Sequence, residues 1–355
     1  MSALLEEIRA MVALEGPISV ERYMTLCLAH PTHGYYVTRD PLGAAGDFTT
    51  APEISQMFGE LIGLWAAGVW MDMGAPRRLR LVELGPGRGT LMGDALRAMR
   101  VAPGLREAVD LHLVETSPVL RARQAEALRA YGPSWHDDPA SVPPGPAIVI
   151  ANEFLDALPV RQYVRARGAW HERLVGLDDD GRLAFGLAAE PETGIERAAP
   201  EGSVVEVAGA GLALARRLAE RLAAAGGAAL VIDYGHEGPG LGDTLQAVRR
   251  HAFADPLADP GEADLTTHVN FSALARAAQA GGCAVRGPVA QGAFLRALGI
   301  EARAERLKRA ASPPQAGAID AALARLAGPG PEGMGELFKA IAFTHPALPA
   351  PPGFA

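Results

Sequence analysis

Short apolar runs alternate with amphipathic stretches through the middle of the chain. The runs Leu79–Leu84, Leu111–Val114 and Ala147–Ala151 have the length of buried strands. Patterns with helical spacing separate them, over Thr90–Arg100 and Pro118–Tyr131. Strands that alternate with helices usually form a parallel sheet with right-handed crossovers. The pattern therefore predicts an α/β fold built on a doubly wound sheet.

The spacing changes from that of helices to that of strands between about residues 160 and 207. Apolar and polar positions alternate over Gln162–Arg167, Trp170–Leu177 and Leu183–Leu187, and an Asp-rich turn ending in Gly181 joins the last two. We expect an antiparallel β insertion in the α/β domain. The α/β alternation then returns, and its expected elements are helix Leu212–Ala225, strand Ala229–Asp233, helix Phe271–Ala280, strand Ala284–Val289 and a last strand Leu337–Phe343, antiparallel at the far end of the sheet.

The first 75 residues have a helical pattern that a polar loop interrupts. A short amphipathic helix precedes Gly16, Ser19 is positioned to cap a helix over Val20–Leu28, and a second long helix is expected over Glu53–Met73. Between them lies a segment rich in Gly, Pro, Asp and Thr. The predicted organisation is a helical N-terminal region with a substrate loop over residues 1–75, the α/β domain over residues 76–345 and a loose, proline-rich tail over residues 346–355.

Composition narrows the class of protein. The 355-residue chain is 49% hydrophobic and 21% charged, as expected for a globular protein with a full core. Its net charge of −8 argues against nucleic acid as the main partner and suits a cationic substrate. Two cysteines form neither a disulfide framework nor a metal cluster. Early acids and the absence of a long apolar run predict no signal peptide and no membrane insertion, and we expect a cytoplasmic protein of bacterial type.

The segment LRLVELGPGRGTLM, residues 79–92, combines a strand, a glycine loop and a helix start. Gly85, Gly87 and Gly89 leave no side chain between the backbone and a ligand. Glu83 ends the strand, where it would repel the pyrophosphate of NAD but attract an amino group and a sulfonium cation. S-adenosylmethionine has both groups. The alternative is a tight turn beside an exposed acid.

Further polar residues follow the next strands of the predicted sheet. Glu115 comes directly after the second strand, where a carboxylate can accept both ribose hydroxyls of an adenosine; a helix-start charge is the alternative. Trp135 can form a wall beside the adenine or belong to a surface loop. Asn152 and Glu153 follow the fourth strand, beside the expected ligand crevice, and can position an acceptor nitrogen.

Other polar residues indicate a function less specifically. The loop that contains Asp47 and Glu53 can act as a lid over a cationic substrate or as an ordered connection. His268 can be a base, although a lone histidine is more often structural, and Asn270 can cap the following helix. HExxH, paired CxxC and GxSxG motifs are absent from the sequence, which argues against metalloprotease, zinc-site and hydrolase functions.

The chain resembles the MidA-like class I methyltransferases, the family of the mitochondrial complex I assembly-factor protein arginine methyltransferase. The resemblance runs from about Ile18 to Phe343 and rests on an ordered set of motifs: YMTLCL, HGYY, GDFTTAPEISQMFGE, LVELGPGRGTLMGD, VETSPVLRARQ, ANEFLDALPV, VIDYG, DTLQAVRRH, DLTTHVNF and MGELFKAIAF. It implies a Rossmann-like class I methyltransferase sheet, S-adenosylmethionine as cofactor, symmetric dimethylation of an arginine in a partner protein, and a link to assembly of respiratory complex I. Asn270 departs from the family pattern, in which Asp is expected.

The resemblance also assigns cofactor and acceptor residues. The glycine motif falls on the three loop glycines, the ribose acid on Glu115, and the motif after the strand on Asn152 and Glu153. A free guanidinium is a poor nucleophile because its charge is delocalised and it holds its protons tightly. Our hypothesis is that the Glu153 carboxylate grips two of its N–H groups, with Asp47 or Glu53 as a second carboxylate.

Three other functions remain open at this point. The chain can be an assembly chaperone that keeps the cofactor fold without catalysis, or a methyltransferase with a small-molecule acceptor. A nicotinamide-dependent oxidoreductase is the third, although Glu83 and the Gly-x-Gly-x-Gly spacing weigh against it.

Overall fold

A computed structural model describes residues 2–43, 46–238 and 240–354 of the chain. The chain forms two compact units. The first unit contains Met1–Phe48, Asp156–Ala213 and His236–Asn270. The second unit contains Thr49–Leu155, Leu214–Gly235 and Phe271–Ala355.

The second unit is built on a mixed sheet with the strand order β15-β16-β10-β5-β2-β3-β4. Its strands are β2 (Leu79–Leu84), β3 (Val109–Val114), β4 (Ser134–His136), β5 (Ala147–Asn152), β10 (Gly227–His236), β15 (Ala284–Ala290) and β16 (Phe338–Thr344). Neighbours from β4 to β10 are parallel, whereas β16 runs antiparallel to both β10 and β15. The order reverses between β2 and β5, which makes their carboxyl ends a topological switch point, where α/β proteins bind ligands.

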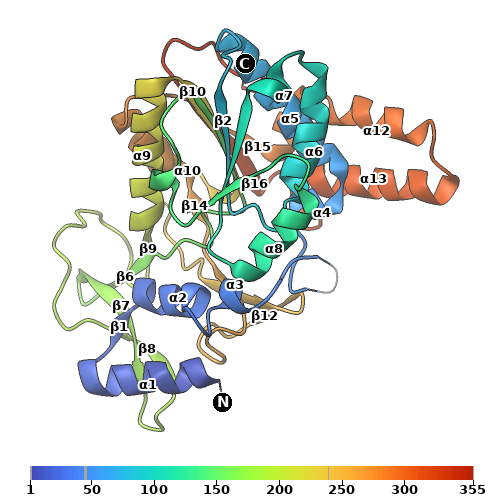
Figure 1. Cartoon of the computed structure of the whole chain (residues 1–355). Helices are drawn as coiled ribbons and strands as arrows, with labels where there is room; N and C mark the ends of the chain where they lie inside the picture. The colour runs from blue at the N-terminus through green and yellow to red at the C-terminus, as the bar shows by residue number, and fades with distance from the viewer. Residues whose placement is uncertain (1, 44–45, 239, 355) are drawn as a thin grey trace. The chain divides into compact units, whose positions relative to one another are not determined.

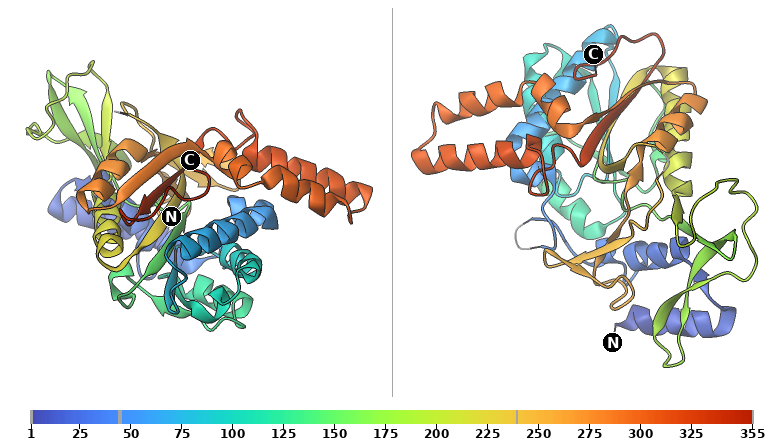
Figure 2. Two further views of the ribbon diagram at one scale, coloured as in Figure 1. Left: turned by 90° about the horizontal axis from the view of Figure 1, so that it is seen from above. Right: turned by 180° about the vertical axis from the view of Figure 1, so that it is seen from behind.

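Helices α5 and α6 cover one face of this sheet, and α9 and α10 cover the other (Figures 1 and 2). The helices of this unit are α4 (Ala51–Ile54), α5 (Gln56–Asp72), α6 (Thr90–Ala98), α7 (Leu105–Ala108), α8 (Pro118–Ala127), α9 (Gly209–Ala225, which begins in the first unit), α10 (Phe271–Ala280), α11 (Gln291–Ala297), α12 (Ile300–Lys308) and α13 (Pro313–Ala327), with short 3₁₀ turns at Met99–Val101 and Pro139–Ser141. Helices α12 and α13 form a hairpin that extends away from the sheet (Figure 1).

Helix α5 packs closely on α6, the helix that begins directly after the glycine loop. A Cβ atom at Gly63 of α5 would lie 2.4 Å from the carbonyl oxygen of Ala95 in α6, and Gly59 faces α6 in the same way. Because these two positions are four residues apart, they share one helix face and let the backbones approach. The core between these helices and the sheet includes fully buried Trp65 and Phe58.

The described residues of the first unit form two small antiparallel sheets, the helices α1 to α3 and the start of α9. The larger sheet has the order β1-β7-β6-β9, with β8 paired to β7, and the smaller has the order β12-β11-β13. The elements are α1 (Ala3–Glu15), β1 (Ile18–Ser19), α2 (Val20–Ala29), α3 (Tyr35–Thr38), β6 (Arg161–Ala166), β7 (Ala169–Leu177), β8 (Leu183–Leu187), β9 (Val204–Val207), β11 (Gln246–Arg249), β12 (Ala252–Ala254), β13 (Asp264–Thr266) and β14 (Val269–Asn270).

The predicted α/β class and its central sheet are confirmed, and several details differ, among them the small sheet of β11 to β13, which was not predicted. The helix expected over Glu53–Met73 is interrupted at Ser55, which is extended and whose hydroxyl accepts a hydrogen bond from Met57 N to start α5. Strand β16 lies between β10 and β15 and not at the end of the sheet. Helices α11 to α13 were not predicted.

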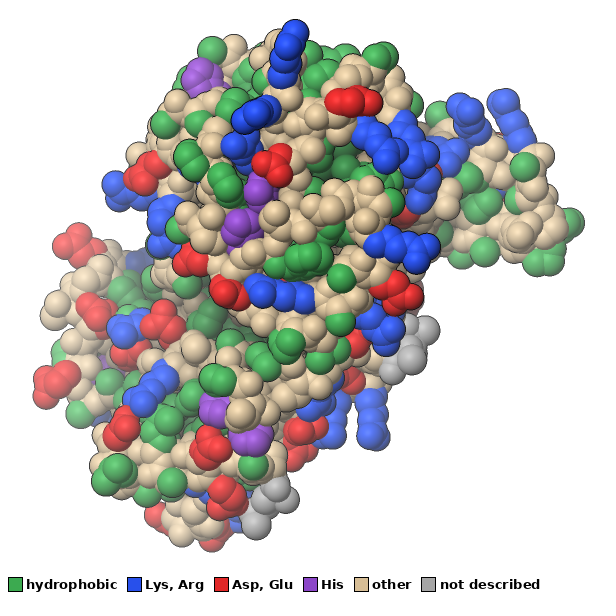
Figure 3. Space-filling model, in the orientation of Figure 1, with side chains coloured by type: hydrophobic (Ala, Val, Ile, Leu, Met, Phe, Trp, Pro, Cys, Tyr) green, Lys and Arg blue, Asp and Glu red, His purple; other side chains and the backbone are tan. Residues whose placement is uncertain are grey.

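The two units group the chain differently from the predicted regions. Helix α5 belongs to the second unit, and the strands of the predicted insertion share the first unit with α1 and α2. In the segment predicted to be a loose tail, the ring of Phe354 lies 5.2 Å from that of Phe294. The domain boundaries at residues 75 and 345 stay a prediction. On the face shown in Figure 3, acidic and basic side chains are interspersed over the surface.

Candidate functional site

The glycine loop connects β2 to α6 at the switch point of the sheet. Gly85, Gly87 and Gly89 have φ angles of 62°, 53° and 82°, in the left-handed region that favours glycine. A Cβ atom at Gly85 would also lie 2.7 Å from Cδ2 of Phe154, so even alanine would clash there. The backbone conformation therefore favours glycine at all three positions, and the contact with Phe154 excludes a side chain at Gly85, whether or not a ligand is bound.

Glu83 lies near the end of β2 with a buried carboxyl group. Its side chain is only 2% exposed, and Oε2 has no hydrogen-bond partner within the part of the chain that the structure describes. Burial, and to a smaller extent the charge of the nearby Glu115 carboxylate, raise the pKa of Glu83 to about 8. A buried carboxyl oxygen without a partner, next to the glycine loop, fits a cationic group such as the amino group of S-adenosylmethionine.

Glu115 follows β3 and is held by two donors. Its Oε1 accepts a hydrogen bond from Ser117 N at 2.8 Å, and its Oε2 accepts one from Gln124 Nε2 at 3.1 Å. Burial raises the pKa of Glu115, and these two hydrogen bonds oppose that rise. The carboxylate therefore has a fixed orientation at the tip of the strand next to β2.

Gln124 of α8 was not singled out from the sequence. It is fully buried and also accepts a hydrogen bond from Trp135 Nε1 at 2.9 Å. The signal in the sequence is a glutamine one helical turn before Leu128, on the face of α8 that carries buried Leu120. A buried amide on such a face predicts a polar partner.

Asn152 and Glu153 mark the end of β5. Asn152 is 8% exposed, and among the described residues its Oδ1 has no hydrogen-bond partner. Its Nδ2 donates to Glu153 Oε1 at 3.0 Å, and Ala51 N donates to the same oxygen at 2.9 Å. Glu153 has a φ of 50°, a left-handed conformation that costs about 1–3 kcal/mol for a residue with a side chain. Such strain is common at functional sites.

Asp233 of β10 fixes the loop that follows Glu153. Its fully buried carboxylate accepts hydrogen bonds from Phe154 N at 3.2 Å and Leu155 N at 2.9 Å through Oδ2, and from Tyr234 N through Oδ1. The loop conformation, including the strained Glu153, is thus set by a strand neighbouring β5 in the sheet.

Glu53 links α4 to the glycine loop. Its Oε1 accepts a hydrogen bond from Thr90 Oγ1 at 2.5 Å, and its Oε2 lies 3.4 Å from Arg88 Nη1. Because Ala51 of the same helix donates to Glu153, α4 is tied to both the loop after β2 and the end of β5. The structure therefore brings Glu53 and Glu153 to the same edge of the sheet as the predicted cofactor residues.

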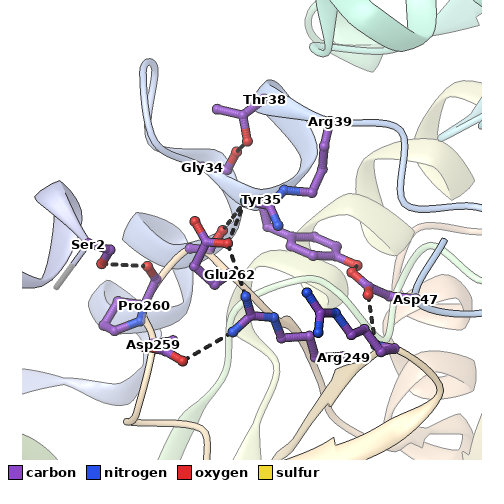
Figure 4. Close-up of polar contacts among 12 residues, drawn as sticks. Ser2, Gly34, Tyr35, Thr38, Arg39, Asp47, Arg249, Asp259, Pro260 and Glu262 are labelled. Atoms are coloured by element: carbon purple, nitrogen blue, oxygen red, sulfur yellow. Dashed lines mark hydrogen bonds and ion pairs between the residues drawn. The ribbon is translucent and has the colours of Figure 1, made fainter.

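Asp47 belongs to the first unit and makes its contacts there (Figure 4). Its Oδ2 accepts a hydrogen bond from Tyr35 Oη at 2.7 Å, and its Oδ1 accepts one from Arg250 N at 2.7 Å. The neighbouring Arg249 pairs with Asp259 at 3.1 Å. In these contacts Asp47 holds the loop before α4 to the turn between β11 and β12.

His268 and Asn270 also lie in the first unit. The backbone N–H of His268 donates to Thr244 Oγ1 at 2.8 Å. Burial lowers the pKa of His268, and the nearby His236 lowers it further, which favours the neutral form of the ring. Among the residues that the structure describes, no group of three His, Cys, Asp or Glu side chains could hold a metal ion, and no helix is long and apolar enough to cross a membrane.

Comparison with known proteins agrees with this geometry. A family model described as S-adenosyl-L-methionine-dependent methyltransferase matches residues 61–289. The mitochondrial protein arginine methyltransferase NDUFAF7 of Danio rerio is 39% identical over 331 residues, covering 85% of this chain and 78% of the relative. The human protein of the same name is also 39% identical, covering 85% and 75%.

A solved structure is similar over the whole chain. A COG1565 superfamily member from Burkholderia thailandensis, bound to S-adenosyl-homocysteine, matches with a TM-score of 0.84 and 31% identity, covering 99% of this chain and 94% of that one. These matches argue against the alternative function considered above, a nicotinamide-dependent oxidoreductase. The cofactor of the enzyme is S-adenosylmethionine. The chain belongs to the family of S-adenosyl-L-methionine-dependent methyltransferases.

Proposed function

We propose that this methyltransferase modifies an arginine side chain of a partner protein. The observation that carries the proposal is the strained, buried end of β5, where Asn152 and Glu153 present an amide and a carboxylate beside the switch point. The net charge of −8 suits a cationic acceptor. The relatives that are named protein arginine methyltransferases support the same acceptor.

The cofactor residues follow from the carboxylates at the strand ends. We assign Glu83 to the amino group of the cofactor and Glu115 to its ribose hydroxyls, with Gly85, Gly87 and Gly89 and the amide of Asn152 beside them. Bound S-adenosylmethionine supplies an electrophilic methyl group on a sulfonium sulfur. The partnerless Oε2 of Glu83 and the fixed carboxylate of Glu115 support these two assignments.

Glu153 is assigned to the acceptor. Because Ala51 N and Asn152 Nδ2 both donate to Oε1, the carboxylate is preorganised and does not have to reorient during the reaction. A carboxylate held in this way can grip a guanidinium, draw its positive charge away from the attacking nitrogen and take up a proton. Glu53 acts as the second carboxylate, and its hydrogen bond from Thr90 supports a position beside the glycine loop; the alternative role of Asp47 stays a prediction from the sequence.

The finer description of the substrate is part of the proposal. Following the family resemblance, we propose symmetric dimethylarginine as the product and a subunit of respiratory complex I as the partner. The compartment stays a prediction: the sequence favours the cytoplasm, whereas the relatives are named as mitochondrial.

The test separates cofactor binding from turnover in the variant Glu153→Gln. Purified wild type or variant is incubated with methyl-labelled S-adenosylmethionine and protein extract from the organism that encodes the chain. The extract protein is then hydrolysed and analysed for labelled methylarginine. We expect turnover to fall by at least about 100-fold with unchanged affinity for S-adenosylhomocysteine. The matched control is Glu126→Gln, on the exposed face of α8. Normal turnover in Glu153→Gln would remove this residue from the mechanism, and label confined to small molecules would refute a protein acceptor.

A further inference from the structure

Gln124 connects three separate segments of the second unit. Its Nε2 donates to the carbonyl oxygen of Gly87 at 2.7 Å and to Glu115 Oε2 at 3.1 Å. Its Oε1 accepts from Trp135 Nε1 at 2.9 Å. The side chain is fully buried, and its partners lie in the loop after β2, directly after β3 and within β4.

The orientation of this amide is dictated by its partners. The indole nitrogen of Trp135 can only donate, so the carboxamide oxygen of Gln124 has to face it. The Gly87 carbonyl and the Glu115 carboxylate can only accept, so the carboxamide nitrogen has to face them. A carboxamide satisfies all three contacts at once, whereas a carboxylate would face two acceptors. The three partners therefore require a side chain with both an acceptor oxygen and a donor nitrogen, which glutamine supplies.

Helix α8 also touches the glycine loop through its backbone. A Cβ atom at Gly89 would lie 3.6 Å from the Cα of Gln124 and 3.2 Å from Leu128 Cδ1. The loop is thus held on α8 both by packing at Gly89 and by the hydrogen bond at Gly87. The same helix residue orients the acid at the tip of the adjacent strand.

We propose that Gln124 is a positioning residue that sets Glu115 and the glycine loop in register for the ribose of the cofactor. The inference rests on the proposed role of Glu115 as the ribose acid. Gln124 does not need to touch the cofactor for this role. Gln124 fixes which oxygen of Glu115 faces the ribose, and it fixes the distance between the glycine loop and the ribose. It therefore affects recognition of the ribose hydroxyls.

The experiment measures binding of S-adenosylhomocysteine and of its 2′-deoxyadenosyl analogue by calorimetry. In the variant Gln124→Met, which keeps the length but loses all three hydrogen bonds, we expect about tenfold weaker binding of S-adenosylhomocysteine. We also expect a smaller ratio between the affinities for S-adenosylhomocysteine and for its 2′-deoxyadenosyl analogue. A purely structural defect would weaken both ligands equally. Wild-type preference in this variant would overturn the inference.

A matched control tests for a general effect of losing a buried amide. Gln291 is equally buried in the same unit, and its Nε2 donates to the carbonyl of Leu326 at 2.9 Å. The variant Gln291→Met should keep the wild-type preference for the ribose hydroxyl. The variant Glu115→Gln separates the two proposals. If it leaves the preference unchanged, the role of Glu115 fails; if it removes the preference while Gln124→Met retains it, only the inference on Gln124 fails.

A milder variant covers the case in which Gln124→Met does not fold. Trp135→Phe keeps an aromatic ring but removes the N–H donor that holds Gln124 Oε1. We expect the same loss of preference, to a smaller extent than in Gln124→Met. Wild-type preference in Trp135→Phe together with failed folding of Gln124→Met would assign Gln124 a structural role and overturn the inference.

Discussion

The buried carboxyl of Glu83 makes the stability of the cofactor-free enzyme depend on pH. The pKa of this group is raised from 4.5 to about 8, first by burial and then by the charge of Glu115. Between these two pH values the unfolded chain ionises Glu83 while the folded chain keeps it protonated. Below about pH 4.5, Glu83 is protonated in both states, and its effect on the free energy of unfolding does not change with pH. Above that pH, the free energy of unfolding decreases as the pH rises toward 8.

The magnitude follows from the width of that interval. At about 1.4 kcal/mol per pH unit, the free energy of unfolding loses about 5 kcal/mol by pH 8, of which about 3 kcal/mol falls between pH 5.5 and pH 8. Glu83→Gln cannot ionise and should not show this loss. The free energy of unfolding of the variant, relative to that of the wild type, should therefore be about 3 kcal/mol higher at pH 8 than at pH 5.5.

The assay is urea unfolding of the cofactor-free wild type and of Glu83→Gln at both pH values, with the exposed Glu126→Gln as control. Because the two proteins differ at one buried group, their difference removes the contribution of all other carboxyl groups. If wild type and Glu83→Gln change in parallel, Glu83 is already ionised in the folded enzyme and the reasoning is refuted.

Three further predictions concern the elements around the site. Gly85→Ala should weaken S-adenosylhomocysteine binding and cost at least about 1–2 kcal/mol by urea unfolding, because the new Cβ meets Phe154 at a left-handed φ; unchanged stability would contradict this. Arg303→Met should destabilise by about 1–3 kcal/mol in the same assay, because it removes the bidentate partner of the buried Glu60 at 2.7 and 2.9 Å and leaves only the longer contact with Arg97 at 3.6 Å and the hydrogen bond from Gln56; a loss below about 0.5 kcal/mol, typical of a surface ion pair, would contradict it. Asp233→Asn should lower turnover at least about tenfold with a smaller effect on cofactor affinity. The reason is that asparagine offers one acceptor oxygen in place of the two that hold the loop after Glu153 and the backbone N–H of Tyr234; equal losses of turnover and affinity would contradict this.

The sheet was predictable where buried strands end at clear turn signals. The bounds of β2, β8 and α10 agree with the sequence prediction, since Gly85, Gly181 and Gly281 follow or precede apolar runs of suitable length. The break at Ser55 was hidden because apolar spacing continues across it. Helices α11 to α13 are rich in alanine and arginine, and their weak apolar period gave no prediction.

The positions of the site residues were predictable to the level of the strand end, because parallel strands end at a common edge. Their partners were not. Asp233 supports the loop after Glu153 from 78 residues away, and Glu53 reaches Thr90 across 37 residues. Such contacts depend on how the strands are ordered in the sheet, which local patterns do not determine. The same reason explains why Gln124 was not identified from the sequence.

The central claim is that carboxylates at the ends of β2 and β3 bind a cationic adenosyl donor. The most direct measurement is a calorimetric titration of the purified chain with S-adenosylmethionine and, under identical conditions, with NAD. We expect saturable binding of S-adenosylmethionine and none of NAD. Binding of NAD, or the failure of S-adenosylmethionine to bind, would contradict it.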